Sequence, residues 1–155
     1  MRSLDQWLIE YGDSHRNPTN EMLHIVCVPA IVLAVLGLLW CVPVPAAFRG
    51  LAPGVNWASL AALAALGYYA TLSLRLAIGM LPTLALGLAL IAALERLAVP
   101  LWQTCVAIFV VAWIGQFVGH AVEGKRPSFF KDVQFLLIGP LWLLSLLFRR
   151  LGLRY

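Results

Sequence analysis

Apolar residues occur along this chain in runs that are too long for the core of a soluble domain. The hydrocarbon layer of a bilayer is about 30 Å thick, and a helix needs about 20 apolar residues to cross it. Uncharged runs of about that length occupy residues 25–48, 50–74, 76–94 and 97–119. The pattern therefore predicts four transmembrane helices.

A fifth apolar run, residues 133–148, is shorter than a regular crossing requires. It contains Gly139 and Pro140, and a proline inside a helix removes one hydrogen bond and bends the axis. We expect a short C-terminal helix that either spans the membrane or forms a re-entrant segment.

The segment before the first long run alternates apolar and polar residues at helical spacing. Leu4, Trp7, Leu8 and Tyr11 recur at three- and four-residue steps, as on one face of a helix. This pattern predicts an amphipathic helix at the membrane interface, ending at Gly12-Asp13. The following Asn17-Pro18 predicts the start of the next helix, since Asn is a favoured N-cap and Pro suits the first helical position.

Composition supports the same class: 62% of the residues are hydrophobic and only 12% are charged, against about 25% charged in soluble domains. We expect residues 1–155 to form a single all-α domain, a polytopic membrane helical bundle.

The net charge of +4 does not indicate a nucleic-acid partner, because the basic residues stand at the ends of apolar runs rather than in one stripe. The sequence leaves the oligomeric state open.

Four crossings place the chain before the first span and the chain after the fourth on one side of the membrane. That side holds six basic residues against two opposite, which favours the cytoplasm by the positive-inside rule. The six are Arg2, Arg16, Arg75, Lys125, Arg126 and Lys131, and the two are Arg49 and Arg96.

The same side holds all three histidines of the chain, His15, His24 and His120. Ionisable residues at membrane depth are costly and indicate function. Asn20 precedes His24 by four residues, and Glu123 follows His120 by three, so each pair shares one helix face. These residues predict a metal site with His15, His24, His120 and Glu123 as ligands and catalytic groups.

The donor set suits Fe(II), and neutral imidazoles would also accept zinc, so ligand chemistry alone does not choose the metal. A di-iron centre would need a second Glu-x-x-His motif and more acidic residues than the chain supplies. A metal or proton transporter would need ionisable residues along the middle of the spans, which hold none. A membrane scaffold without catalysis stays open as a third alternative.

The two polar blocks resemble those of the iron-dependent 2-hydroxy fatty acid dioxygenases, membrane proteins of phytosphingosine degradation. The shared motifs are Tyr11-x3-His15-x4-Asn20-x3-His24 followed by Pro29, then Gly119-His120-x2-Glu123-x2-Arg126-Pro127, and finally Gly139-Pro140-Leu141. Order and spacing fit along nearly the whole chain. Ser145 departs from the pattern, because many relatives carry an acid in the last apolar segment.

The resemblance implies α-oxidation of a 2-hydroxy fatty acid with O₂ by histidine-bound Fe(II), giving an acid that is one carbon shorter. It implies that the three histidines are ligands, that Glu123 is a ligand or a partner of one, and that Asn20 orients an imidazole. We also expect Asn20 to be a substrate-binding residue. We further expect Lys125 or Arg126 to neutralise the substrate carboxylate. Their alternative role is a positive-inside anchor.

Overall fold

The computed structural model describes residues 2–46, 54–130 and 134–155, and these ranges contain helices and no strand. The helices are α1 (Leu4–Gly12), α2 (Pro18–Trp40), α4 (Trp57–Leu72), α5 (Leu74–Leu94), α6 (Leu101–Glu123) and α7 (Phe135–Arg150), with a short 3₁₀ helix, η1 (Ser128–Phe130). The predicted all-α class is confirmed.

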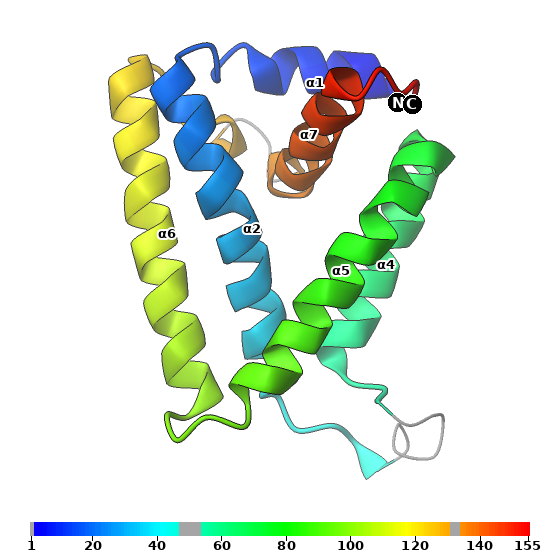
Figure 1. Ribbon diagram of the computed structural model, residues 1–155, viewed down its shortest axis with the longest axis vertical. Helices are drawn as coiled ribbons and strands as arrows, with labels where there is room; N and C mark the ends of the chain where they lie inside the picture. The colour runs from blue at the N-terminus through cyan, green and yellow to red at the C-terminus, as the bar shows by residue number, and fades with distance from the viewer. Residues whose placement is uncertain (1, 47–53, 131–133) are drawn as a thin grey trace.

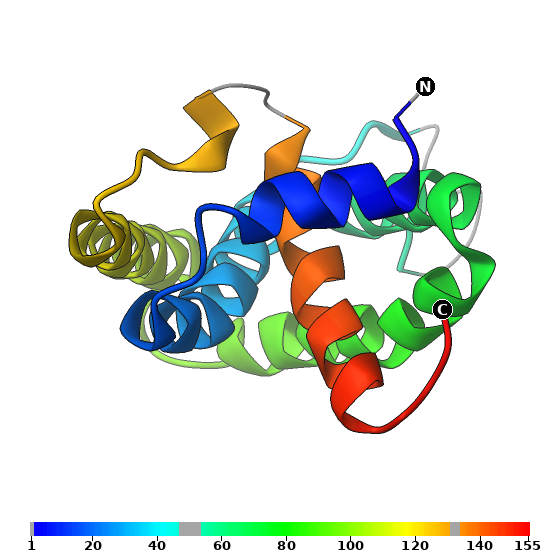
Figure 2. The same ribbon diagram turned by 90° about the horizontal axis from the view of Figure 1, so that it is seen from above.

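The helices form two arms that diverge toward the end that carries both termini (Figure 1). One arm is α2 packed along α6, and the other is α4 packed against α5. Helix α7 lies between the arms at their open end, and α1 lies across that end above it (Figure 2).

Three of the described helices, α2, α5 and α6, are long and apolar enough to cross a membrane. Helix α4 has 16 residues and is a shorter apolar helix, so the fourth predicted span stays a prediction. The helix ends differ from the ends of the apolar runs. Helix α2 begins at Pro18 and ends at Trp40, and α6 extends to Glu123. Residues 47–53, where the first run ends and the second begins, lie outside the described residues.

Local sequence explains where several helices begin. Asn17 caps α2 as predicted, because its side chain accepts a hydrogen bond from the Thr19 N–H at 2.9 Å. Ser73 separates α4 from α5, and its hydroxyl accepts from the Leu76 N–H at 3.3 Å. The break therefore precedes Arg75, the charged residue at which the apolar pattern alone divides the two runs.

Helix α1 ends at Gly12 as predicted, but its apolar face has a protein partner. Trp7, Leu8 and Tyr11 are buried, and the rings of Trp7 and Phe135 meet edge to face at 5.0 Å. The amphipathic pattern therefore serves at least in part to cover α7, whose own aromatic residues need burial.

Helix α7 carries the fifth apolar run and contains Pro140. This proline has no N–H to offer the carbonyl one turn earlier, and nearby the Tyr69 hydroxyl of α4 donates to the Leu137 carbonyl at 2.9 Å. Whether α7 crosses the membrane stays a prediction.

Helices α2 and α6 approach closely because glycines lie along their contact. A Cβ at Gly37 would overlap the Cys105 sulfur, and one at Gly115 would lie 2.6 Å from the Cys27 sulfur. A Cβ at Gly119 would overlap the side-chain oxygen of Asn20. Small residues of this kind let the backbones of membrane helices pack against each other.

Gly37→Leu tests this packing at the end of α2 far from the histidines. We expect a lower melting temperature in detergent, since overpacking a close helix contact costs about 1–3 kcal/mol. Gly67→Leu on α4 is the control, because no atom lies within 4 Å of a Cβ at Gly67. Equal melting temperatures for the two variants would contradict the account of the α2–α6 contact.

Candidate metal centre

The fold brings the three histidines together from separate segments. His15 lies in the connection between α1 and α2, His24 in α2, and His120 in the last turn of α6. Their ring centroids are 4.2 Å apart for His15 and His24, 5.0 Å for His15 and His120, and 4.9 Å for His24 and His120. All three side chains are buried.

Hydrogen bonds fix which nitrogen of two rings carries the proton. Nδ1 of His15 lies 2.6 Å from the Tyr11 carbonyl oxygen, and Nδ1 of His24 lies 2.9 Å from that of Asn20. A carbonyl only accepts, so both Nδ1 atoms donate. In the neutral rings, Nε2 of His15 and of His24 then carries a free lone pair.

Each histidine also has one buried ring nitrogen without a hydrogen-bond partner in the described part of the chain. These atoms are Nε2 of His15, Nε2 of His24 and Nδ1 of His120. Burying an unpaired polar atom costs about 1–3 kcal/mol, and three together at one point need a common partner.

A metal ion fits these nitrogens. Among the described residues, the three histidines each offer one ligand atom, and these atoms lie within 4.8 Å of one another. Burial, and then repulsion from His24, lower the pKa of His15 to about 3, so its imidazole is neutral at pH 7, the form that binds metals. Imidazole accepts iron and zinc alike.

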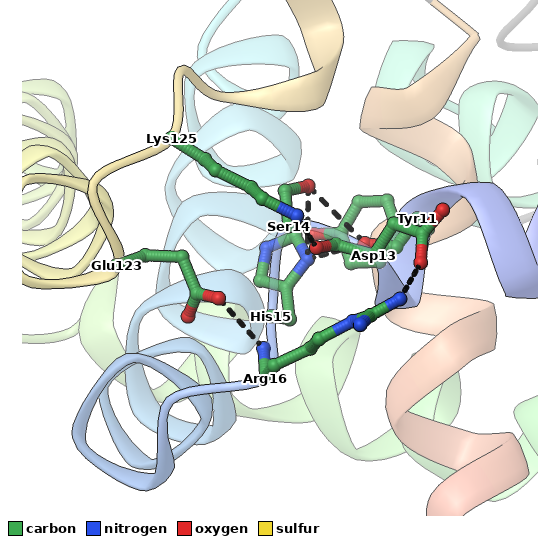
Figure 3. Close-up of polar contacts among 7 residues, drawn as sticks. All are labelled: Tyr11, Asp13, Ser14, His15, Arg16, Glu123 and Lys125. Atoms are coloured by element: carbon green, nitrogen blue, oxygen red, sulfur yellow. Dashed lines mark hydrogen bonds and ion pairs between the residues drawn. The ribbon is translucent and has the colours of Figure 1, made fainter.

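The structure places Glu123 beside the histidines but gives its carboxylate other partners. One oxygen accepts from the Arg16 N–H at 3.0 Å, and the other accepts from the Asn17 N–H at 2.7 Å. Figure 3 shows the carboxylate directed at the loop that carries His15. Its predicted role as a ligand stays a prediction, and its observed contacts hold that loop to the end of α6.

Asn20 contributes to the same contacts. We call the hydrogen bonds of Glu123 and Asn20 that hold the His15 loop to the end of α6 the clamp. Its side chain is fully buried, and its amide nitrogen donates to the Ser14 carbonyl at 2.9 Å and to Glu123 at 3.2 Å. The Asn20 carbonyl also holds the His24 ring. These contacts fit the orienting role that the family resemblance implies.

Lys125 and Arg126 are exposed, and neither lines the cavity described below. The Lys125 amine donates to the Asp13 carbonyl at 2.6 Å, which ties the loop after α6 to the His15 loop (Figure 3). Their predicted contact with a substrate carboxylate stays a prediction.

A cavity of about 930 Å³ lies between the two arms, and its lining includes Tyr11, whose ring stacks on His15. Its walls are almost entirely apolar and come from α2, α4, α5, α6 and α7, with Tyr11 added by α1, and Arg150 is the one charged residue among the described lining residues. Arg150 is paired with Glu21 of α2 at 3.2 Å.

Two lining residues connect the cavity with the metal centre. Tyr11 stacks on His15 with ring centroids 4.2 Å apart, and Gln116 lies against His24. Neither residue was predicted to belong to the site, and Tyr11 entered only through the amphipathic pattern and the shared motif. The signal for Gln116 was its position four residues before His120, which places both on one face of α6.

Comparison with known proteins identifies the family of the chain. The family model described as 2-hydroxy-palmitic acid dioxygenase Mpo1-like matches residues 1–151. The chain belongs to this family. No curated protein and no solved structure gave a match. The resemblance seen in the motifs is therefore confirmed, and the buried histidine cluster is the structural feature of this Mpo1-like chain to which those motifs correspond.

Replacing Glu123 tests the clamp in this Mpo1-like protein. Glu123→Ala leaves two backbone N–H groups of the His15 loop without their acceptor, so we expect metal affinity to fall about 10–100-fold, as for other groups that orient metal ligands. Equilibrium dialysis against a metal buffer measures this change.

The matched control is Glu10→Ala, which removes a half-buried carboxylate of α1 that pairs with Arg2 at 3.6 Å. It should leave metal affinity unchanged. Complete loss of metal in Glu123→Ala would instead indicate that Glu123 is a ligand. Unchanged metal affinity would contradict both its role as a ligand and its role in holding the His15 loop.

Proposed function

We propose that this protein is an Fe(II)-dependent dioxygenase that performs α-oxidation of 2-hydroxy fatty acids in the membrane. The observation that carries the proposal is the set of three buried, unpartnered histidine nitrogens beside an apolar cavity. Membership of a family described as 2-hydroxy-palmitic acid dioxygenase-like supports the substrate class and the use of O₂.

The reaction balances without a further reductant. R–CH(OH)–COOH and O₂ give R–COOH, CO₂ and H₂O: the bond between C1 and C2 breaks, and the two carbons together lose the four electrons that O₂ takes up. No 2-oxoglutarate is required, because the 2-hydroxy acid supplies every electron.

Iron is favoured over zinc by this chemistry. When bound, a non-haem ferrous centre supplies the redox chemistry through which O₂ reacts with an organic acid, whereas zinc has no redox chemistry. His15, His24 and His120 would hold the ion, and Tyr11 and Trp142 pack on the His15 ring, with centroids at 4.2 and 5.2 Å. These aromatic rings hold His15 in place and exclude water from one side.

The cavity suits the alkyl tail of such a substrate. Its walls include Val28, Leu36, Ala62, Leu84 and Leu144, and burial of an alkyl chain contributes about 0.8 kcal/mol per CH₂. A tail lying between the arms leaves the carboxylate and the 2-hydroxyl at the histidine end. A metal or proton transporter would instead need ionisable residues along its path, and Arg150 is the one charged residue among the described lining residues.

The location of the centre follows from the topology. His15 follows α1, His24 lies in the first part of α2 and His120 in the last turn of α6. These segments lie at the end of the arms where α1 and both chain termini lie (Figure 1), and the basic residues of that side favour the cytoplasm. The enzyme would therefore act on 2-hydroxy acids within the bilayer, with its metal near the cytoplasmic face.

Metal loading and product formation test the proposal together. Wild-type protein purified anaerobically with Fe(II) should hold iron and convert 2-hydroxypalmitate to the one-carbon-shorter acid with O₂ uptake. His24→Ala and His120→Ala should lose both the iron and the activity.

Cys41→Ala is the control. Cysteine is a common metal ligand, but Cys41 is exposed and lies at the end of α2 far from the histidines. This variant should keep both properties. Zinc in place of iron, or iron without product from the wild type, would contradict the proposal.

The cavity account predicts a change in chain-length preference. Gly87 of α5 lines the cavity, and no atom lies within 4 Å of a Cβ there, so Gly87→Leu fills space without a clash. We expect kcat/KM to fall for long 2-hydroxy acids and to be kept for shorter ones. A uniform loss across chain lengths, or the same change in Gly67→Leu, would contradict the assignment of the tail to this cavity.

A further inference from the structure

Gln116 is a buried amide whose donor has no acceptor in the described part of the chain. Its side chain is 6% exposed, and its Nε2 atom has no hydrogen-bond partner. Nearly all buried polar groups in folded proteins are hydrogen-bonded. An unpaired amide donor in a wall of the cavity therefore points to an acceptor that a ligand supplies.

The position of Gln116 identifies the part of the ligand that it meets. It lines the cavity, lies within hydrogen-bonding reach of the His24 ring and stands one helical turn before His120 on α6. Its Nε2 donor is nevertheless without a partner in the part of the chain that the structure describes. About one turn before Gln116 on the same helix lies Trp113, which also lines the cavity. Its indole nitrogen is a second buried donor without a partner among the described residues. The polar end of the cavity thus offers neutral N–H donors close to the metal centre.

Two exposed cations nearby have protein partners of their own. Lys125 donates to the Asp13 carbonyl, and Arg150, which does line the cavity, is paired with Glu21. A carboxylate has two acceptor oxygens and about four lone-pair directions. One carboxylate oxygen can face the metal centre while the other accepts a hydrogen bond from an amide.

We propose that Gln116 is a positioning and specificity residue whose amide donates a hydrogen bond to the carboxylate of the acyl substrate. This inference rests on the proposed function and deepens it. Gln116 holds the acid end of the chain at the histidines and distinguishes a fatty acid from a hydrocarbon of equal length, while the apolar walls bind both.

Ligand binding to metal-free protein in lipid nanodiscs tests this assignment without catalysis. The ligands are 2-hydroxypalmitate, palmitate and hexadecane, each displacing a fluorescent fatty acid. Gln116→Met keeps the length of the side chain and removes both donors. We expect it to weaken binding of the two acids about tenfold, the value of one hydrogen bond to a charged group, with hexadecane affinity unchanged.

Two further variants complete the experiment. Gln116→Glu has nearly the same shape and places a carboxylate against the ligand, so it should weaken binding of the acids at least as strongly. Gln103→Met changes an exposed glutamine in the first turn of α6 and should bind all three ligands like the wild type. Iron content equal to that of the wild type establishes that the Gln116 variants are folded.

Unchanged affinity for the acids, or an equal loss for the acids and hexadecane, would overturn the inference. Failure of the proposed function looks different: the wild type would bind 2-hydroxypalmitate and depend on Gln116, but would form no shortened acid when loaded with iron.

Discussion

The structure depends on the close contact between α2 and α6. Glycines at positions 37, 115 and 119 remove the side-chain atoms that would separate the two helices. His24 and His120 can then lie with ring centroids 4.9 Å apart, although nearly one hundred residues of sequence separate them. The same contact fixes α6 as a wall of the cavity, so it sets both the histidine cluster and the place proposed for the substrate tail.

The third histidine comes from outside the long helices and needs a separate means of positioning. Glu123 accepts hydrogen bonds from two successive backbone N–H groups that directly follow His15, and Asn20 joins Glu123 to the Ser14 carbonyl. Such charge-assisted bonds are strong in a partly desolvated place. The polar residues of the two motifs thus act together, because the loop and both helix ends must be fixed before three nitrogens can share one ion.

Much of this arrangement could be predicted from the sequence, because apolar runs, the Asn17-Pro18 cap and the histidines act through local or depth-related rules. Two features could not. The burial of the α1 aromatic residues against α7 is a tertiary contact, and an amphipathic pattern does not distinguish a protein partner from a lipid surface. Gln116 stands four residues before His120, but this spacing alone does not distinguish a glutamine in an apolar run, and the residue becomes notable only when its amide is found buried and its donor unpaired.

The central claim is that His15, His24 and His120 bind one iron ion through their unpartnered nitrogens. X-ray absorption spectroscopy at the iron edge of the ferrous protein tests it most directly, because imidazole rings give a characteristic multiple-scattering pattern. The account predicts three imidazoles per iron, one from each of the three histidines. Iron bound only by oxygen ligands, or by a single imidazole, would contradict it.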